Sequence, residues 1–179
     1  MEEQDLKLLL KALSFSAQKH KDQRRKDVDA SPYINHPISL ASILCNEAHV
    51  TDIDVICGAL LHDTVEDTDT TFDELSREFG ETIKGIVADV SDDKSLTKAE
   101  RKQQQIEHAA HASDKAKMVK LADKISNLRD VSTNAPSDWS LARRQEYFDW
   151  AKKVIDQVRG THDDLEALFD VAYSVRPTA

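Results

Sequence analysis

The amino-acid sequence predicts an all-α protein, folded as a single domain with about nine or ten helices. Most segments repeat their apolar residues at the 3.6-residue period of an amphipathic helix. No alternating apolar–polar run of useful length indicates a β-strand, and no repeat or low-complexity tract interrupts the pattern. The 179 residues suffice for one substantial core but are too few for two enzymatic domains of ordinary size.

The first helix is expected from residue 4 to residue 26, because the side chains that would face a core keep helical spacing there. Those side chains are Leu6, Leu9, Leu10, Leu13, Ala17 and His20. A second helix is expected to begin at His36–Pro37, since proline suits the first helical position and holds the preceding residue extended. This helix continues through Ile38, Ala41, Ile43, Leu44 and Ala48.

A third, strongly apolar helix is expected over residues 53–66, with Thr51 or Asp52 as its N-cap. Thr71 and the glutamate three residues after it have the spacing of a capping box. This signal predicts a short helix that ends at Gly80, because glycine commonly terminates helices.

The remaining helices are expected at residues 81–91, 98–110, 114–130, 139–159 and 162–174. Between two of them, the stretch Ser91–Thr97 is polar, charged and without apolar periodicity. We therefore predict that this stretch is a functional loop.

The composition excludes several classes of protein. Lysine and arginine number 24 against 33 aspartates and glutamates, so the formal net charge is −9 and nonspecific binding to nucleic acid is not expected. The chain has only 4 glycines, and they form no glycine-rich phosphate loop, dinucleotide-binding turn or nucleophile elbow. If this protein handles phosphates, it must therefore use a metal ion and side chains.

The distribution of apolar residues and cysteines predicts a location. The longest apolar stretch, at residues 55–61, is far shorter than the roughly 20 residues that a membrane span needs. The N-terminus is acidic and amphipathic, unlike a secretory signal. Cys45 and Cys57 lie in apolar segments without a CxxC spacing, which is typical of buried thiols in a reducing compartment. We expect a cytoplasmic protein that does not bind membranes.

Imidazole and carboxylate side chains gather at the end of the third predicted helix, in ICGALLHDTVEDTDTTFDE. His62 and Asp63 are adjacent, about 100° apart around a helix, and Glu66 and Asp67 follow them by four residues each. All four side chains would therefore project from neighbouring faces. So much charge beside an apolar run favours a bound cation, although a frayed, solvated last turn is the simpler alternative.

Two further segments supply similar groups. In MVKLADKISNLRD, Asp123 and Asn127 form an i, i+4 pair beside the buried stripe, where an aspartate alone would more often pair with a neighbouring lysine. His36, at the start of the second helix, would alone more often be a cap than a ligand. Taken together with His62–Asp63, these residues give the order H…HD…D on three helices, which is the metal signature of HD phosphohydrolases.

This set of side chains predicts the kind of metal. Two imidazoles and two carboxylates form a mixed nitrogen–oxygen site, which suits Mn²⁺, Fe²⁺ or Zn²⁺ better than Mg²⁺. An ion of this kind acidifies water and polarises a phosphoryl oxygen. Together with the resemblance to the HD signature, this donor set predicts metal-dependent phosphoester hydrolysis.

Four segments make a resemblance specific, namely HKDQRRKDVDASPYINHPISLASIL, ALLHDTVEDTDTTFDEL, VSDDKSLTKAERK and KMVKLADKISNLRD. They closely resemble the hydrolase domain of RelA/SpoT enzymes, and most of all the stand-alone small alarmone hydrolases, including the metazoan SpoT-like homologue. The resemblance covers residues 6–170 and implies one HD hydrolase domain over residues 1–179. It also implies one Mn²⁺ ion per chain and removal of pyrophosphate from the 3′ position of ppGpp or pppGpp.

The resemblance also implies roles for individual residues. The metal ligands would be His36, His62, Asp63 and Asp123. Glu66 and Asp67 would position or deprotonate the attacking water. The substrate contacts would be Arg25, Lys26, Lys98, Asn127, Arg143 and Tyr147. Without the resemblance, Arg25 and Lys26 are equally well explained as cations near a helix C-terminus, Arg143 as a partner of Glu146, and Tyr147 as a packing residue.

Two other functions are consistent with the residues. One is an HD phosphatase that acts on the 2′-phosphate of NADPH or on another phosphorylated nucleotide, since these substrates share a phosphorylated ribose with the alarmone. The other is a helical binding module in which the HD pair only holds a structural metal. The extra carboxylates of Glu66 and Asp67 argue against the binding module, because a structural site is closed and does not need them. The sequence does not determine the oligomeric state.

Overall fold

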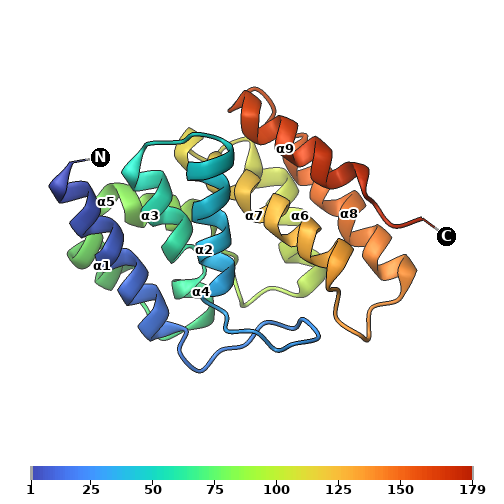
Figure 1. Ribbon diagram of the computed structural model, residues 1–179, viewed down its shortest axis with the longest axis horizontal. Coiled ribbons are helices and arrows are strands. Elements are labelled where there is room, and N and C mark those ends of the chain that lie inside the picture. The colour runs from blue at the N-terminus through green and yellow to red at the C-terminus, as the bar shows by residue number, and fades with distance from the viewer. Residues whose placement is uncertain (1, 179) are drawn as a thin grey trace.

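The computed structural model describes residues 2–178, and the two terminal residues of the predicted 1–179 domain lie outside that range. Within residues 2–178 the regular structure is helical, apart from one isolated β-bridge between Arg24 and Pro32 (Figure 1). The α-helices are α1 (Glu3–Lys19), α2 (Asn35–Ser42), α3 (Ile53–Leu61), α4 (Thr64–Asp67), α5 (Phe72–Val90), α6 (Lys98–Ala109), α7 (Asp114–Thr133), α8 (Leu141–Ile155) and α9 (Asp163–Ser174). A π-helical turn, η1 (Ile43–Glu47), follows α2. The predicted all-α class is confirmed.

The helices form two packed groups. In one, α1, α3 and α5 enclose buried side chains such as Leu75 and Ile83. In the other, α7, α8 and α9 pack with α2 and η1 around Ile125, Phe148 and Phe169. Figure 1 shows the first group on the left and the second on the right, and α2 and α7 are in contact between them. The two groups therefore meet along α2, α3 and α7.

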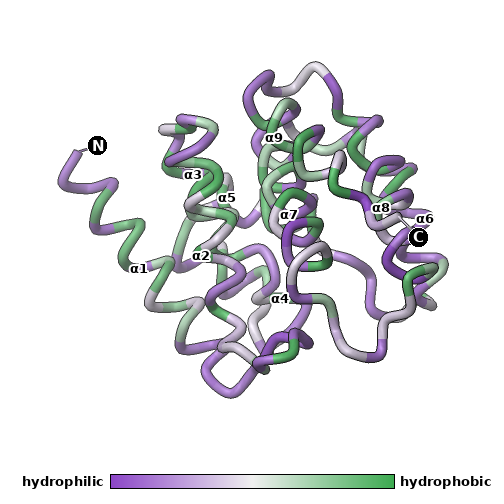
Figure 2. The backbone as a smooth tube through the Cα atoms, turned by 45° about the vertical axis from the view of Figure 1, so that its right-hand side comes forward, coloured by the Kyte–Doolittle hydropathy of each residue, from purple (hydrophilic) through white to green (hydrophobic). Residues whose placement is uncertain are grey.

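Helix α3 belongs to both groups, which explains why it is apolar on every side from Val55 to Leu61. Val55 and Ala59 pack into the larger cluster, and Cys57 and Leu60 pack into the smaller one. A helix buried all round has no face for polar residues. Figure 2 shows the contrast with the loop over residues 20–34, which is mostly hydrophilic. Among residues 2–178, no helix combines the length and the hydropathy that a membrane crossing requires.

The structure corrects the predicted helix 53–66 at the residues that carry the chemistry. Helix α3 ends at Leu61, and the one-turn helix α4 begins at Thr64. The Thr64 hydroxyl donates to the carbonyl oxygen of Leu61 at 2.7 Å, which gives that carbonyl a partner outside the regular helical pattern. His62 and Asp63 therefore lie in a turn between two helices and not on one continuous helical face.

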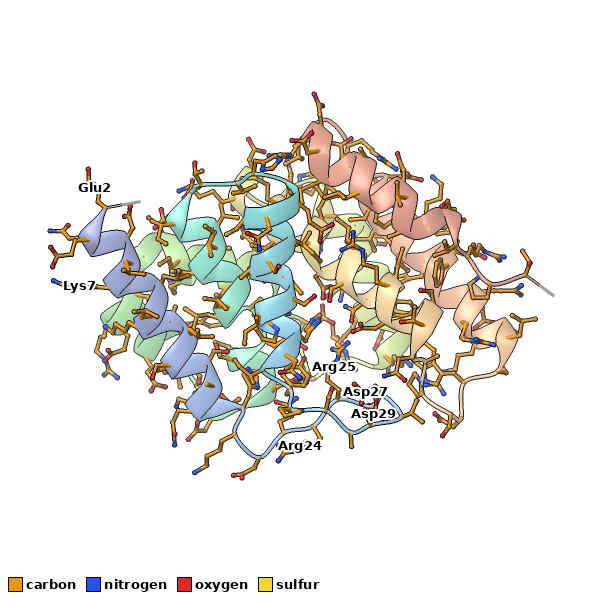
Figure 3. The ribbon with its side chains drawn as sticks, in the orientation of Figure 1. Glu2, Lys7, Arg24, Arg25, Asp27 and Asp29 are labelled. Atoms are coloured by element: carbon orange, nitrogen blue, oxygen red, sulfur yellow. The ribbon has the colours of Figure 1, made fainter. Side chains whose placement is uncertain are left out.

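The first helix is also shorter than predicted, because α1 ends at Lys19 and not at residue 26. Residues 21–27 are all polar, so a longer helix would bury no apolar surface in that stretch. The chain instead forms a loop that is closed by the bridge between Arg24 and Pro32. In Figure 3, Arg25 points from this loop toward the helices, and Arg24 points away from them.

Several predicted boundaries are confirmed. Asp52, and not Thr51, is the N-cap of α3, and its carboxylate accepts a hydrogen bond from the backbone N–H of Asp54 at 3.0 Å. The Thr71 hydroxyl caps α5 by accepting from a backbone N–H at 3.1 Å. Gly80 has a φ of +84°, which breaks α5 into two segments at the predicted place.

The start of α2 differs slightly from the prediction. The helix begins at Asn35, so Pro37 occupies the third helical position and not the first. Proline is tolerated there because the first N–H groups of a helix have no partner within the helix. The apolar run then ends in η1, where the backbone N–H of Ala48 reaches back five residues to the carbonyl of Ile43 at 3.0 Å.

Gly58 lies where α3 packs on α5, with no space for a side chain. A Cβ atom there would be 2.6 Å from Cγ2 of the buried Ile86. We expect Gly58→Ala to lower the Tm, because overpacking costs about 1–3 kcal/mol and alanine returns at most about 1 kcal/mol of helix propensity. Gly85→Ala is the matched control, since nothing lies within 4 Å of its Cβ position. Thermal unfolding followed by circular dichroism measures both, and equal Tm values would contradict the close contact.

Candidate active site

Three helices bring two imidazoles and a carboxylate together. His36 comes from α2, His62 follows the last residue of α3, and Asp123 comes from α7. One ligand atom from each of these residues lies within 4.8 Å of the other two. Both imidazoles are buried and the carboxylate is partly exposed. The meeting of the two helix groups therefore creates a group of donors that the sequence distributes over 88 positions, from residue 36 to residue 123.

Asp63, the fourth predicted ligand, adjoins this group without belonging to it. Its Oδ2 atom lies 2.9 Å from Nε2 of His62 and also accepts a hydrogen bond from the Tyr33 hydroxyl. Three of the four predicted ligands therefore form the compact group, and Asp63 contacts it through His62. The sequence analysis did not identify Tyr33, and no spacing in the sequence relates it to Asp63.

Hydrogen bonds from the far side of each ring orient the two imidazoles. Nδ1 of His62 lies 2.8 Å from the carbonyl oxygen of Ala59, so it carries a proton and donates to that oxygen. Nδ1 of His36 lies 3.3 Å from the Ser126 hydroxyl, and its Nε2 lies 3.2 Å from Oδ1 of Asp123. These bonds at Nδ1 leave both Nε2 atoms facing the carboxylates of Asp123 and Asp63, and a metal-binding imidazole typically has its other ring nitrogen bonded in this way.

The charges of this group fit a divalent cation. Burial lowers the pKa of His62, but the neighbouring Asp63 carboxylate outweighs burial and raises that pKa to about 9. Burial raises the pKa of Asp123, but Lys124 and His36 hold it well below its ordinary value. Both carboxylates thus remain ionised beside the buried imidazoles, and a divalent ion would take the place of the proton on Nε2 of His62 in a mixed nitrogen–oxygen donor set.

Asn127 and Lys124 hold Asp123 in place. The side-chain N–H of Asn127 donates to Oδ1 of Asp123 at 2.6 Å, and Nζ of Lys124 lies 2.9 Å from Oδ2. Arg25, from the 20–34 loop, donates to Oδ1 of Asn127 at 3.3 Å and forms an ion pair with Asp130 at 2.6 Å. The structure therefore brings Arg25 and Asn127 together, whereas the partner Asp130 was not predicted.

Glu66 and Asp67 lie on α4, beside the predicted functional loop 91–97. The backbone N–H of Asp92 donates to Oε2 of Glu66 at 2.9 Å. Nζ of Lys94 lies 2.7 Å from Oδ1 of Asp67 and 3.7 Å from Oε1 of Glu66. Burial, with help from Asp63 and Asp92, raises the pKa of Glu66 to about 7. Glu66 can therefore either donate or accept a proton near neutral pH.

A cavity of about 850 Å³ joins these groups to a set of cations. It is lined by the metal-donor group, by Glu66 and Asp67 of α4, and by cationic side chains of α6, α7 and α8. Lys98, Arg143 and Tyr147, which were predicted as substrate contacts, all line this cavity. Arg143 pairs with Asp138 at 3.4 Å and not with Glu146. A second cavity of about 380 Å³ adjoins the first and shares Arg25, Asn127 and Tyr147 with it.

Lys26 is the predicted substrate contact that lies apart from the main cavity. It is exposed and lines only the second cavity. Its neighbour Arg25 lines both cavities and points inward. The two residues therefore differ in position although they are adjacent in the sequence.

The sequence analysis missed several cations of the main cavity, namely Arg101, Lys102, Lys120 and Lys124. One tryptophan, Trp150, lies beside two of them. Nζ of Lys124 lies 4.5 Å from the centre of the Trp150 ring, and Nζ of Lys102 lies 4.8 Å from the same ring. Burial and Lys124 lower the pKa of Lys120 to about 8. A signal was present in the sequence, because Lys120 and Lys124 interrupt the apolar stripe of α7.

An all-helical fold with such a donor set beside a cation-lined cavity is typical of metal-dependent hydrolases of the HD type. A model of the family described as HD domain matches residues 12–149. The chain therefore belongs to the HD domain family. Hydrolases of this family imply a divalent metal ion, and the group formed by His36, His62 and Asp123 could hold one.

Comparison with individual proteins shows which members of the HD domain family this chain is similar to. The chain is 57% identical over 159 residues to guanosine-3′,5′-bis(diphosphate) 3′-pyrophosphohydrolase MESH1 of Danio rerio, covering 89% of this chain and 88% of that protein. It is 55% identical over 158 residues to the protein of the same name from Homo sapiens, covering 88% of each. A solved structure, described as a metazoan ortholog of SpoT that hydrolyzes ppGpp and plays a role in starvation responses, matches with a TM-score of 0.91. That match has 49% identity and covers 94% of this chain and 95% of the other. The resemblance to stand-alone RelA/SpoT-type hydrolases is confirmed.

Proposed function

We propose that this protein hydrolyses ppGpp and pppGpp at the ribose 3′ position and releases pyrophosphate with GDP or GTP. The observation that carries the proposal is the lining of the 850 Å³ cavity, which combines metal donors and carboxylates with a set of cations. A substrate with one phosphate group to be cleaved and further phosphates to be held fits such a cavity. The names of the relatives support the same reaction.

We infer that His36, His62, Asp63 and Asp123 hold one Mn²⁺ ion per chain. Two imidazoles and two carboxylates, one of them at the edge of the group, suit Mn²⁺, Fe²⁺ or Zn²⁺ by ligand type, and the resemblance to RelA/SpoT enzymes favours Mn²⁺ among them. When bound, an ion at this position supplies a Lewis acid that acidifies water and polarises a phosphoryl oxygen. The protein's contribution is to bury the imidazoles, fix their rings through Nδ1 and keep the carboxylates ionised.

Glu66 and Asp67 are proposed to handle the attacking water and its protons. Glu66 can take up or release a proton near neutral pH, because burial raises its pKa to about 7. Asp67 has both carboxylate oxygens bonded to donors, Lys94 at 2.7 Å and Gln23 at 2.9 Å. We therefore assign proton transfer to Glu66, and to Asp67 the role of a carboxylate that these two donors hold in a fixed position beside it.

The products follow from which phosphorus the water attacks. Attack on the phosphorus bonded to the ribose breaks its bond to O3′, and ppGpp plus water becomes GDP plus pyrophosphate. Attack on the outer phosphorus would instead release orthophosphate. Chromatography of the reaction products, combined with separate assays for pyrophosphate and orthophosphate, decides between these reactions.

The same assay, repeated with NADPH, tests the alternative substrate. We expect pyrophosphate to be the main product from ppGpp. Orthophosphate as the main product from ppGpp, or efficient cleavage of NADPH with ppGpp untouched, would contradict the proposed function. Because Cys45 and Cys57 are free thiols, as is typical of a reducing compartment, we predict that the reaction takes place in the cytoplasm.

Arg25 is predicted to bind substrate in the ground state and the transition state alike. Its guanidinium lines both cavities and is held by Asp130 at 2.6 Å, a position suited to a nucleotide base or phosphate. Arg25→Gln should therefore raise KM for ppGpp more than it lowers kcat. Lys26→Gln should also raise KM for ppGpp, but by a smaller factor, because Lys26 lines only the outer cavity. Steady-state kinetics measure both, and an unchanged KM in Arg25→Gln would contradict the assignment.

A further inference from the structure

The turn after α1 reaches the carboxylate pair of the site through a short chain of hydrogen bonds. His20 is 2% exposed, and its Nδ1 lies 2.6 Å from Oε1 of Gln23. The side-chain N–H of Gln23 donates to Oδ2 of Asp67 at 2.9 Å. No motif in the sequence connects these three residues, because 44 positions separate Gln23 from Asp67.

The partners fix where the protons lie. An amide oxygen only accepts, so Nδ1 of His20 carries the proton that bonds to Oε1 of Gln23. The amide nitrogen of Gln23 then faces Asp67, whose Oδ2 accepts its hydrogen bond. A flipped amide would instead place its oxygen against the oxygen of Asp67, which puts two acceptors together. Asp67 therefore specifies the orientation of Gln23, and the amide oxygen of Gln23 then specifies the tautomer of His20.

The backbone of Gln23 is held as firmly as its side chain. Its N–H donates to the carbonyl of His20 at 2.9 Å, and its carbonyl accepts from the N–H of Tyr33 at 3.1 Å. The other partner of Asp67 is less restrained, because the Lys94 side chain is 51% exposed. Gln23 is therefore the more ordered of the two donors to Asp67.

The imidazole of His20 makes this arrangement at a cost to stability. Within residues 2–178 its Nε2 atom is buried without a hydrogen-bond partner. A buried unpaired polar atom costs about 1–3 kcal/mol, so an apolar residue would serve the fold better at this position. Its ring packs on Tyr33, with 4.8 Å between centroids, and thereby places Nδ1 toward Gln23.

We propose that Gln23 is a positioning residue for Asp67 and that His20 orients Gln23. This inference rests on the proposed role of Asp67 in hydrolysis. Gln23 lines only the outer cavity and acts on the reaction through Oδ2 of Asp67, while Lys94 holds Oδ1. Loss of the amide leaves the carboxylate with the mobile lysine alone, so that the carboxylate turns away from the water it must face.

The first test is the kinetics of Gln23→Leu, which keeps the size of the side chain and removes the amide. We expect kcat for ppGpp to fall about 10–100-fold, with KM changed less than about twofold, because displacing a reacting group by about 1 Å has effects of this size. Bound metal and Tm should match the wild type. His20→Phe keeps the aromatic packing and should lower kcat in the same direction. Asp22→Asn, an exposed neighbour in the same turn, is the control and should have wild-type kinetics.

A double-mutant cycle separates positioning from a general effect on structure. If Gln23 acts through Asp67, the kcat of the double variant Gln23→Leu with Asp67→Ala should equal that of Asp67→Ala within about twofold. Losses that multiply would overturn the proposal. A rise in KM with unchanged kcat in Gln23→Leu would also overturn it, since Gln23 would then contact substrate.

A crystal structure of substrate-free Gln23→Leu tests the same inference without any reaction. We expect the Asp67 carboxylate to leave the position that it has in the wild type, and an unmoved carboxylate would contradict positioning whatever the substrate. Turnover of ppGpp by the wild type, measured in the same series, tests the proposed function separately. Failure of the positioning role of Gln23 is thus distinguishable from failure of the proposed function.

Discussion

Asp63→Ala is expected to lose both its bound metal ion and its hydrolysis of ppGpp. Asp63 contacts Nε2 of the buried His62 at 2.9 Å, and its removal leaves a single carboxylate, Asp123, among the proposed ligands. A catalytic metal contributes several kcal/mol to the transition state, so we expect turnover to fall on the order of 10³-fold or more. Metal analysis after equilibration with Mn²⁺, together with pyrophosphate release, measures both losses.

Two controls make this result interpretable. Asp164→Ala removes an exposed aspartate of α9 and should retain metal and turnover. Circular dichroism establishes whether Asp63→Ala keeps its helical content, and Asp63→Asn tests the charge with nearly the same volume. Stoichiometric metal in Asp63→Ala would show that His36, His62 and Asp123, which already form the compact group, suffice as ligands.

Glu66→Ala and Asp67→Ala are expected to retain metal and lose most turnover. Neither side chain belongs to the compact donor group, and both face the loop over residues 91–97 through Asp92 and Lys94. The loss of a general acid or base typically lowers the rate by about 10²–10⁴-fold. Single-turnover measurements with saturating Mn²⁺ separate this loss from weaker metal binding.

The isosteric variants Glu66→Gln and Asp67→Asn refine the assignment of roles. An amide at position 66 cannot take up or release a proton near neutral pH, so we expect Glu66→Gln to lose as much turnover as Glu66→Ala. Asparagine at position 67 lacks the charge that attracts Lys94, and it should lose the fixed position of the side chain. Turnover near that of the wild type in both alanine variants would contradict these roles, and loss of metal in either would identify a ligand.

Much of the fold could be predicted because its signals are local. Helix caps at Asp52 and Thr71 and the helix break at Gly80 depend on side chains within a few residues, and the structure has all three. The predicted helix 53–66 was wrong because apolar periodicity does not register a hydroxyl such as that of Thr64, which bonds to the preceding turn. The end of α1 at Lys19 was missed because a polar stretch can continue a helix or leave it, and only contacts elsewhere in the fold decide.

The candidate site likewise has features that could be predicted from the sequence and features that could not. The sequence by itself determined the order of imidazoles and carboxylates, and with it the chemical class of the protein. Only the tertiary structure decided which of these groups form one compact set, that Tyr33 and Gln23 hold the carboxylates, and that Lys120 and Lys124 face the same cavity. The physical reason is that ligand type and local spacing depend only on residues that are near one another in the sequence. The distances between side chains of α2, α3 and α7, in contrast, are set only when the two helix groups bury their apolar faces against each other.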